Sequence, residues 1–306
     1  MYSKEQIQQG LDELRLKYGE WNFDIPLPFD IWTKGNLGEP QTRLKRIVQV
    51  VNDLSVKPIS KCRILDLGCS DGQFSIEFAL HGANTIGVEA REANIKKAIF
   101  SKEVLNLKNL EFRQDDIRKI SVESYGKFDA IICSGFFYHL PAIDAIKLIK
   151  TMHEMVNRLI VLDVRVALEP IERVQYDNDE YWGTLFQEHP ENATAEEKEK
   201  RLFYSIDNMT SFWFTRPSLI NILSKAGFSS IYECFTPVHM NFGKPGIHHP
   251  DHLTFIAVKG ENCELKTSPT ANGLREKWPE GSLTYVPEKA KFSIKRLPLK
   301  LRKSHI

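Results

Sequence analysis

The chain has 306 residues, of which 42% are hydrophobic and 26% charged, so it has enough material for one large folded domain or two small ones. Its formal net charge of +1 gives no support for a global attraction to nucleic acid or to a membrane surface, although a local basic patch stays possible. No apolar run approaches the roughly 20 residues that span a bilayer, and the polar N-terminus lacks the apolar core of a signal peptide. We therefore expect no membrane partner.

The cysteines suggest a reducing compartment. There are five, with no C-x-x-C pair among them: Cys62, Cys69, Cys133, Cys234 and Cys263. An odd number of scattered cysteines provides neither a disulfide framework nor a metal site. A cytoplasmic enzyme without a bound metal is the expectation.

Residues 1–58 are predicted to form a prefix that lies against a later domain. Helical spacing of apolar residues predicts helices over residues 3–18 and 41–56. Between them, residues 21–32 are aromatic and contain two prolines, a composition typical of an extended segment over a neighbouring core.

From residue 62 onward, short apolar strands alternate with amphipathic helices. The predicted strands are residues 63–67, 84–89, 110–114, 128–133 and 158–164, and the predicted helices are 73–81, 93–105 and 143–155. Such alternation predicts an α/β fold with a parallel sheet covered by helices on both faces.

The alternation stops after the fifth strand. Residues 166–212 are polar with scattered aromatic residues, and we interpret them as an insert over one end of the sheet that acts as a substrate lid. The mixed charges of residues 196–201 are typical of a solvated helix face. A helix over 217–226 and strands over 230–235 and 253–258 complete a predicted domain at 59–260, and residues 261–306 are expected to form a loosely packed tail.

The turn after the first predicted strand is the main chemical signal. It places Gly68, Ser70 and Gly72 at a strand-to-helix junction, where the backbone bends sharply and a ligand can approach closely. The dinucleotide pattern G-x-G-x-x-G is not met because residue 70 is serine, and the phosphate-binding G-x-x-x-x-G-K-[ST] is absent. Instead, Asp66-x-Gly68-x-Ser70-x-Gly72 resembles motif I of the class I S-adenosylmethionine-dependent methyltransferases, with serine at the middle glycine.

Three later positions agree with that family. Glu89 ends the second strand, where a carboxylate can accept both ribose hydroxyls, Asp115-Asp116-Ile117 follows the third, and Ser134-Gly135 follows the fourth. The resemblance covers about residues 40–260 and implies a Rossmann-like, seven-stranded, mostly parallel sheet with an antiparallel last strand. It also implies S-adenosyl-L-methionine as cofactor, held by Asp66, Gly68, Ser70, Gly72, Glu89, Ala90, Asp116, Ile117, Ser134 and Gly135.

These residues also have simpler interpretations. The glycines could serve only the turn, and Asp66 could only cap the following helix. Of the two neighbouring aspartates we prefer Asp116, because it directly precedes the apolar Ile117.

His139 is the candidate catalytic base. It lies just beyond the fourth strand in Tyr138-His139-Leu140, and an imidazole can remove a proton from a hydroxyl or amine acceptor. The alternative is a histidine packed in the first turn of the next helix.

For the substrate we consider Tyr138, Trp182, Trp213, His248 and His249. The tryptophans could form a lid or simply the core of the insert. The histidines of the 239–252 loop could line a substrate pocket or belong to an ordinary loop, and the adjacent His248 and His249 would point apart in extended chain, which disfavours a metal site.

The favoured function is methyl transfer to an oxygen or nitrogen of a small or medium-sized acceptor, such as a natural product or a sugar. Carboxymethyl or methyl transfer to a tRNA nucleoside is an alternative, since Trp32-Thr33-Lys34-Gly35 loosely resembles the tRNA wobble-uridine carboxymethyltransferases; nucleic acid is nevertheless an unlikely partner. A nicotinamide-binding oxidoreductase and a non-catalytic nucleoside-binding module also stay open. The oligomeric state is unknown.

Overall fold

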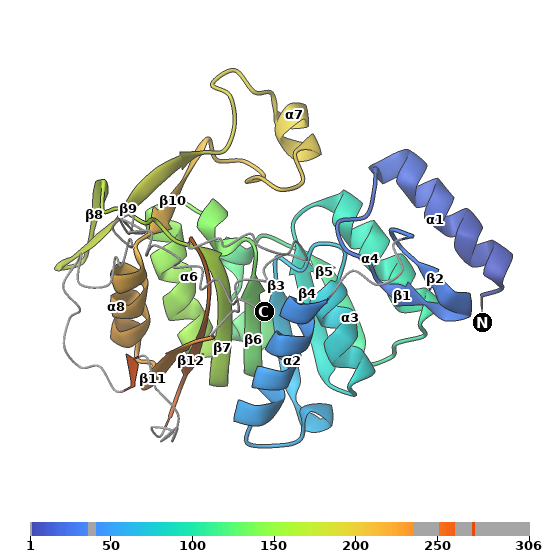
Figure 1. Ribbon diagram of the computed structural model, residues 1–306, viewed down its shortest axis with the longest axis horizontal. Helices are drawn as coiled ribbons and strands as arrows, with labels where there is room; N and C mark the ends of the chain where they lie inside the picture. Colours follow the sequence, from blue (N-terminus) through green and yellow to red (C-terminus); the bar gives the residue numbers. More distant parts are fainter. Residues whose placement is uncertain (1, 36–40, 235–250, 261–270, 273–306) are drawn as a thin grey trace, which may run out of the picture.

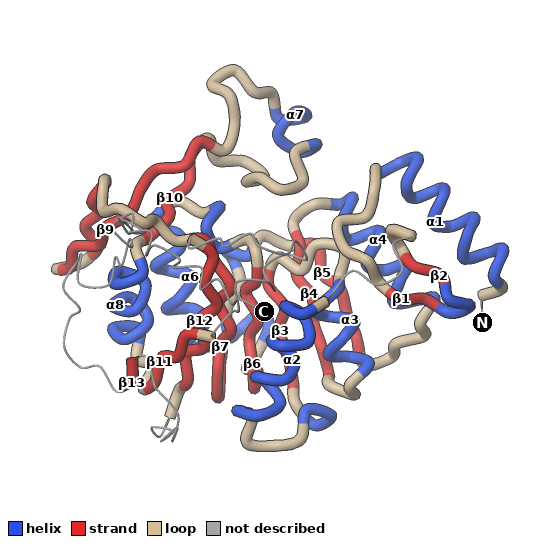
Figure 2. The backbone as a smooth tube through the Cα atoms, viewed as in Figure 1, coloured by secondary structure: helices blue, strands red, loops and turns tan. Residues whose placement is uncertain are grey.

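The structure is a computed structural model that describes residues 2–35, 41–234, 251–260 and 271–272. Its centre is an eight-stranded sheet with the strand order β13-β11-β12-β7-β6-β3-β4-β5 (Figure 2). The strands of this sheet are β3 (Arg63–Leu67), β4 (Asn84–Glu89), β5 (Leu110–Gln114), β6 (Phe128–Ser134), β7 (Val156–Arg165), β11 (Ser230–Glu233), β12 (His252–Val258) and β13 (Ala271–Asn272).

Strand directions follow the predicted pattern. Strands β3 to β7 run parallel to one another, while β12 lies antiparallel between β7 and β11. The predicted Rossmann-like sheet with an antiparallel last strand is therefore confirmed. The two-residue β13, which lies in the predicted tail, adds an eighth strand antiparallel to β11.

Helices cover both faces because successive strand residues point to opposite sides. Ile64 packs in the cluster that contains α2 and α3, whereas Leu65 packs in the cluster that contains α6 and α8. The helices are α1 (Lys4–Tyr18), α2 (Thr42–Leu54), α3 (Gln73–Leu80), α4 (Glu92–Val104), α5 (Val122–Tyr125), α6 (Ala142–Met155), α7 (Ala195–Lys200) and α8 (Arg216–Ala226).

The prefix lies against the later part of the chain. Ile7 and Leu11 of α1 and the nearby Trp21 are buried in one cluster with α3 and with Val104 of α4. A short hairpin of β1 (Pro26–Leu27) and β2 (Ile31–Trp32) follows, joined by a 3-10 turn, η1 (Pro28–Asp30). The prefix thus approaches the sheet beside the turn after β3.

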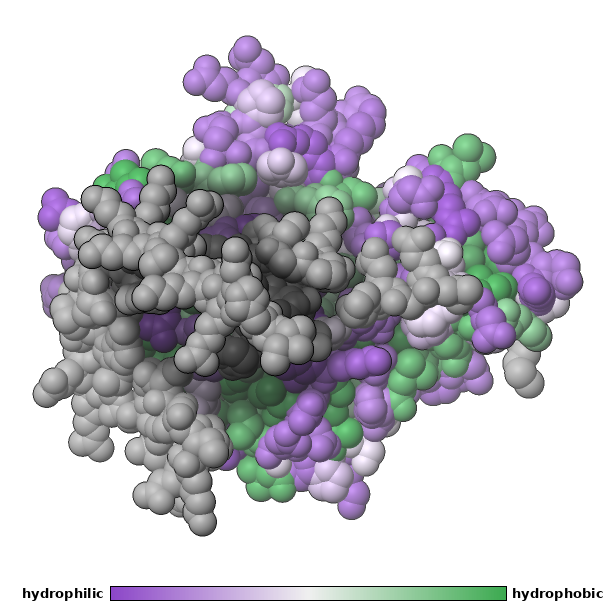
Figure 3. Space-filling model, viewed as in Figure 1, coloured by the Kyte–Doolittle hydropathy of each residue, from purple (hydrophilic) through white to green (hydrophobic). Residues whose placement is uncertain are grey.

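The insert after β7 forms a second, three-stranded antiparallel sheet of order β10-β9-β8, together with α7 (Figure 1). Its strands are β8 (Glu172–Tyr176), β9 (Asp179–Gln187) and β10 (Thr210–Phe214). Strand β10 runs to Phe214, paired with Gly183, so the insert extends two residues beyond the predicted end at 212. Its projecting end around α7 is mostly hydrophilic (Figure 3), in agreement with the solvated helix predicted there.

Within the described residues, no helix is long and apolar enough to cross a membrane. His248 and His249, most of the 239–252 loop and the predicted tail apart from β13 lie outside those residues.

Candidate functional site

A cavity of about 610 Å³ lies at the carboxyl ends of the parallel strands. Ligands of open α/β sheets bind at this edge, and the volume is that of a typical small-molecule site. The cavity wall comes from the turns after β3, β4, β5 and β6, from the end of β7, from Phe23 and Arg43 of the prefix, and from residues 202–208 of the insert. The prefix, the sheet and the insert thus enclose one site.

The turn after β3 has the backbone conformation that its glycines allow. Gly68 has a φ of 63° and Gly72 a φ of 92°, both in the left-handed region. A Cβ at Gly68 would lie 2.4 Å from Cδ1 of Phe136, which also lines the cavity. Glycine is therefore required here both by the conformation and by the close approach of the neighbouring loop.

Glu89 presents its carboxylate at the cavity wall beside this turn. Its two oxygens accept hydrogen bonds from the backbone N–H groups of Ser70, at 3.0 Å, and Arg91, at 2.9 Å. Burial raises the pKa of Glu89, and these hydrogen bonds oppose that effect in part. The carboxylate is held in one orientation, with Ala90 beside it on the wall.

Asp66 and Gly72 are not among the described residues that line the cavity. They stabilise the turn after β3 through contacts outside the cavity. The hydroxyl of Ser75 donates to Asp66 at 2.6 Å, and burial raises the pKa of Asp66 to about 7. Asp66 also accepts a hydrogen bond from the backbone of Ser75 in the first turn of α3, whose N-cap residue is Gly72. A Cβ at Gly72 would lie 2.6 Å from the Phe112 ring.

Asp116 and Ile117 also line the cavity. Arg118 binds the Asp116 carboxylate at 2.9 Å and also reaches Asp207 of the insert at 2.6 Å. Burial raises the pKa of Asp116, but the Arg118 pair outweighs it, so the net shift is downward. Asp115 instead accepts a hydrogen bond from the Tyr125 hydroxyl at 2.7 Å.

Ser134 and Gly135 line the cavity where β6 ends beside β7. The Ser134 hydroxyl donates to the buried carboxylate of Asp163 at 3.2 Å, which also bonds Arg43 at 3.2 Å and His252 at 3.1 Å. Burial raises the pKa of Asp163, yet these partners hold it well below its usual range. His252, from the predicted histidine loop, also lines the cavity.

His139 also lines the cavity and belongs to the short 3-10 helix η4 (Phe137–His139). Its Nδ1 is 2.9 Å and 3.0 Å from the two carboxylate oxygens of Glu188, and its ring lies against Tyr138, with centroids 4.4 Å apart. Nε2 makes no hydrogen bond to any other described residue. Both Tyr138 and His139 therefore belong to the cavity wall.

The two tryptophans are not among the described residues that line the cavity. The Trp213 ring stacks on the Phe186 ring, with centroids 4.6 Å apart. It also contacts the Tyr138 ring edge to face, with centroids 5.9 Å apart. The backbone N–H of Trp182 bonds Ser218 of α8.

Sequence reasoning missed the residues that join distant segments around the cavity. Arg91 is buried, and its guanidinium donates to five backbone carbonyls of the insert, those of Lys198, Glu199, Arg201, Tyr204 and Ser205. Asn22 reaches Ser70, and Glu188 reaches His139. The only signal for Arg91 was its place two residues after Glu89.

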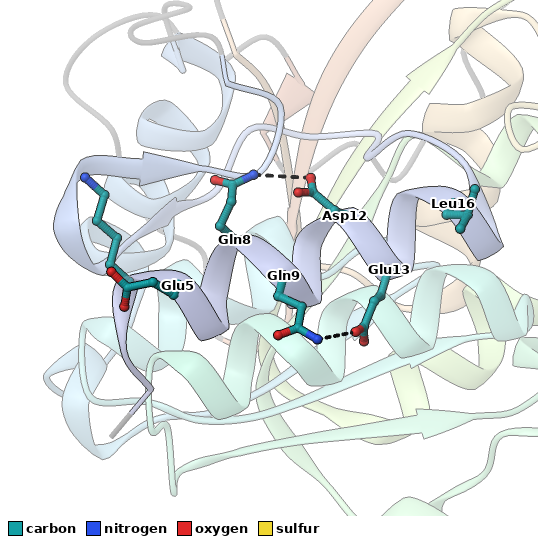
Figure 4. A pocket seen from close by; sticks show the side chains of 7 residues that line it. Glu5, Gln8, Gln9, Asp12, Glu13 and Leu16 are labelled. Atoms are coloured by element: carbon teal, nitrogen blue, oxygen red, sulfur yellow. Dashed lines mark hydrogen bonds between the residues drawn. The ribbon is translucent and has the colours of Figure 1, made fainter.

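A second hollow, of about 690 Å³, lies on the outer face of α1 (Figure 4). Its polar side chains pair along the helix, Gln8 with Asp12 at 3.2 Å and Gln9 with Glu13 at 2.8 Å. It brings together no groups for catalysis. Across the described part of the chain, no three His, Cys, Asp or Glu side chains are arranged to hold a metal ion.

The sheet order, the glycine turn after β3 and the acid at the end of β4 define a methyltransferase of the Rossmann-like type. A family model described as "Methyltransferase domain" matches residues 59–207. This match, together with the fold, supports a class I S-adenosylmethionine-dependent methyltransferase, a class whose cofactor is S-adenosylmethionine.

Two kinds of curated relatives are similar to parts of the chain. A ubiquinone biosynthesis O-methyltransferase of Acinetobacter baumannii is 27% identical over 95 residues, which are 31% of this chain and 39% of that protein. The bifunctional methyltransferase/kinase WbdD of Escherichia coli, an O-antigen chain terminator, is 29% identical over 152 residues, 48% of this chain and 20% of WbdD. The chain thus spans well under half of either relative.

Among solved structures, the N-terminal domain of EvdMO1, crystallised in the presence of SAH and D-fucose, matches with a TM-score of 0.62. The match covers 85% of this chain and 97% of that domain at 22% identity, so it supports the fold.

Proposed function

We propose that the protein transfers the methyl group of S-adenosylmethionine to an oxygen, or a nitrogen, of a small or medium-sized acceptor such as a sugar or another natural product. Two named relatives support this acceptor class: one is a ubiquinone O-methyltransferase, and EvdMO1 was crystallised with D-fucose. The observation that carries the proposal is a single cavity whose wall contains both Glu89 and His139.

The cavity residues Glu89, Asp116 and Ile117 suit the nucleoside part of the cofactor. The fixed carboxylate of Glu89 would accept the ribose hydroxyls, and Asp116 with Ile117 would contact the adenine. Gly68, Ser70, Ser134 and Gly135 would border the methionine part, with Asp66 and Gly72 keeping the turn in shape from below. The missing Cβ of the left-handed Gly68 makes room for Phe136, so both residues would border the ligand.

His139 would act as the base that removes the acceptor's proton. When bound, the cofactor supplies a methyl group on a positively charged sulfur, which makes that group reactive. The chain's part is to align an acceptor with it, an effect worth up to ~7–11 kcal/mol in favourable cases, and to exclude water. His139 Nε2 would take the proton of the acceptor hydroxyl, a contribution of about 10²–10⁴-fold. Tyr138 would form the adjoining wall of the acceptor site.

Calorimetry with S-adenosylhomocysteine and with NADH tests the cofactor. We expect S-adenosylhomocysteine to bind, and Glu89→Ala to weaken it about tenfold or more, whereas Glu111→Ala, which breaks a surface pair with Arg113, should leave binding unchanged. Tight binding of NADH without binding of S-adenosylhomocysteine would contradict the proposal and favour an oxidoreductase.

A screen with radiolabelled methyl donor tests the acceptor. Sugars, phenols and bulk tRNA are offered separately, and label is expected in a small molecule. Transfer to tRNA alone would favour the nucleoside alternative. His139→Ala should lower turnover about 10²-fold or more while S-adenosylhomocysteine still binds; full turnover would make His139 structural.

A further inference from the structure

Glu188 is a buried carboxylate that the cofactor site does not use. It follows the last residue of β9, has no exposed surface, and lies where the insert meets the loop after β6. An unpaired buried carboxylate is costly, so its partners indicate what it does. They are the Ser211 hydroxyl at 2.6 Å, the Ser205 backbone N–H at 2.9 Å and Nδ1 of His139.

These partners favour the ionised form of Glu188. Burial raises its pKa, but the hydrogen bond and the charge of His139, followed by the bonds from Ser211 and Ser205, lower it by more. An ionised carboxylate can only accept hydrogen bonds. Nδ1 of His139 therefore carries a proton, and in the neutral ring the lone pair is on Nε2.

We infer that Glu188 is a positioning residue that fixes the tautomer and the orientation of His139 for proton removal from the acceptor. This inference rests on the proposed function. In the step itself the acceptor O–H bond breaks and an Nε2–H bond forms. The oxygen electron pair makes the new O–CH₃ bond, and the pair of the broken carbon–sulfur bond stays on sulfur. Glu188 then faces an imidazolium, whose charge it stabilises.

The insert thereby contributes to the chemistry as well as to the cavity wall. Glu188, Ser205 and Ser211 all belong to it, and Arg91 and Arg118 fasten the same segment to the turns after β4 and β5. The base is therefore fully oriented only when residues 188–211 lie against the sheet as they do here. This arrangement would couple closure of the site to activation of the acceptor.

The substitution Glu188→Gln tests the inference, with Glu180→Gln as a matched control on β9, where Glu180 makes only a surface pair with Arg173. The first readout needs no ligand: side-chain ¹⁵N NMR of the neutral His139 ring. We expect the wild type and Glu180→Gln to show Nδ1 protonated and Nε2 unprotonated, and Glu188→Gln to show a mixture of tautomers. An unchanged spectrum in Glu188→Gln would overturn the inference.

Turnover and binding form the second readout. With a sugar or phenol that the screen identifies, Glu188→Gln should lower kcat about 10²-fold and leave KM and S-adenosylhomocysteine affinity within about twofold. Glu188→Asp, which is shorter, should not restore kcat. Wild-type turnover in Glu188→Gln would refute the positioning role alone, whereas a wild type that binds no S-adenosylhomocysteine would refute the proposed function instead.

A wild-type measurement covers the case in which Glu188→Gln does not fold. A proton on Nδ1 that is bonded to a carboxylate gives a far-downfield ¹H signal, and we expect one that disappears in His139→Gln. Absence of this signal from the folded wild type would also overturn the inference.

Discussion

The side-chain amide of Asn22 donates a hydrogen bond to the hydroxyl of Ser70 over 2.7 Å, which ties the prefix to the turn after β3. Ser70 has a φ of 52°, a conformation that costs a non-glycine residue roughly 1–2 kcal/mol. Beside it, the buried carboxylate of Asp71 accepts the backbone N–H groups of Asn22, at 2.6 Å, and Phe23, at 2.9 Å. The serine that departs from the family's glycine is thus, together with Asp71, a residue that binds the prefix to this turn.

Asn22→Ala should therefore weaken cofactor binding. Removing the amide breaks its bonds to Ser70 and Asn94, leaves only the backbone bonds to Asp71, and loosens the neighbouring Phe23, which lines the cavity. We expect the Kd for S-adenosylhomocysteine to rise roughly fivefold to tenfold, equivalent to about 1 kcal/mol, by calorimetry. Asn52→Ala, on the exposed side of α2, is the control. Equal affinities in the two variants would mean that the prefix does not influence the turn.

Asp66→Asn should change how stability depends on pH. Burial raises the pKa of Asp66 from 3.8 to about 7, so between those values the folded chain keeps a proton that the unfolded chain has lost. The free energy of unfolding then falls as pH rises through this window, by at most ~1.4 kcal/mol per pH unit. Asparagine abolishes this dependence.

Urea unfolding of both proteins at pH 5, 6, 7 and 8 measures the effect. The free energy of unfolding of Asp66→Asn, minus that of the wild type, should increase from pH 5 to pH 7 and then level off. A difference that stays constant over this range would show that Asp66 is ionised in the folded protein throughout.

The contrast between Glu89 and Glu188 explains how much the sequence could predict. Glu89 was predicted because it ends a strand at a fixed distance from a glycine turn, and strand, turn and spacing are all local patterns. Glu188 approaches His139 only because the insert folds back over the sheet, across 49 residues of chain. The parallel sheet followed from periodicity, whereas Asn22, Arg91 and Glu188 depend on contacts that no local pattern encodes.

The tryptophans illustrate the same limit. Aromatic residues in an insert can form its core or a substrate wall, and composition does not distinguish the two. Here Trp213 stacks on Phe186 of the insert and contacts Tyr138, and Tyr138 is the residue that lines the cavity.

Arg91→Met should release the segment that contains α7. The substitution keeps an apolar stem but leaves five carbonyls without their donor, and a buried unpaired group costs about 1–3 kcal/mol. Amide hydrogen exchange over residues 198–205 should become at least tenfold faster, with a lower affinity for S-adenosylhomocysteine. Arg173→Met, which breaks only the surface pair with Glu180, should leave both unchanged. Unaltered exchange in Arg91→Met would show that the insert is held without this guanidinium.

Gly68→Ala separates two demands on the glycine turn. Alanine must adopt a φ of 63°, and its Cβ would lie 2.4 Å from Phe136. Gly35→Ala provides the comparison, because Gly35 has a φ of 75° but no atom within 4 Å of an added Cβ, so it reports the conformational cost alone. We expect Gly35→Ala to lower the free energy of unfolding by about 1 kcal/mol and to leave cofactor binding unchanged.

Gly68→Ala should lower the free energy of unfolding by about 2–4 kcal/mol, since a typical overpacking cost adds to the conformational cost. It should also weaken the binding of S-adenosylhomocysteine at least about tenfold, because Phe136 must move into the cavity. The double variant Gly68→Ala/Phe136→Ala should recover part of that affinity; if it recovers none, strain in the turn and not the clash limits binding.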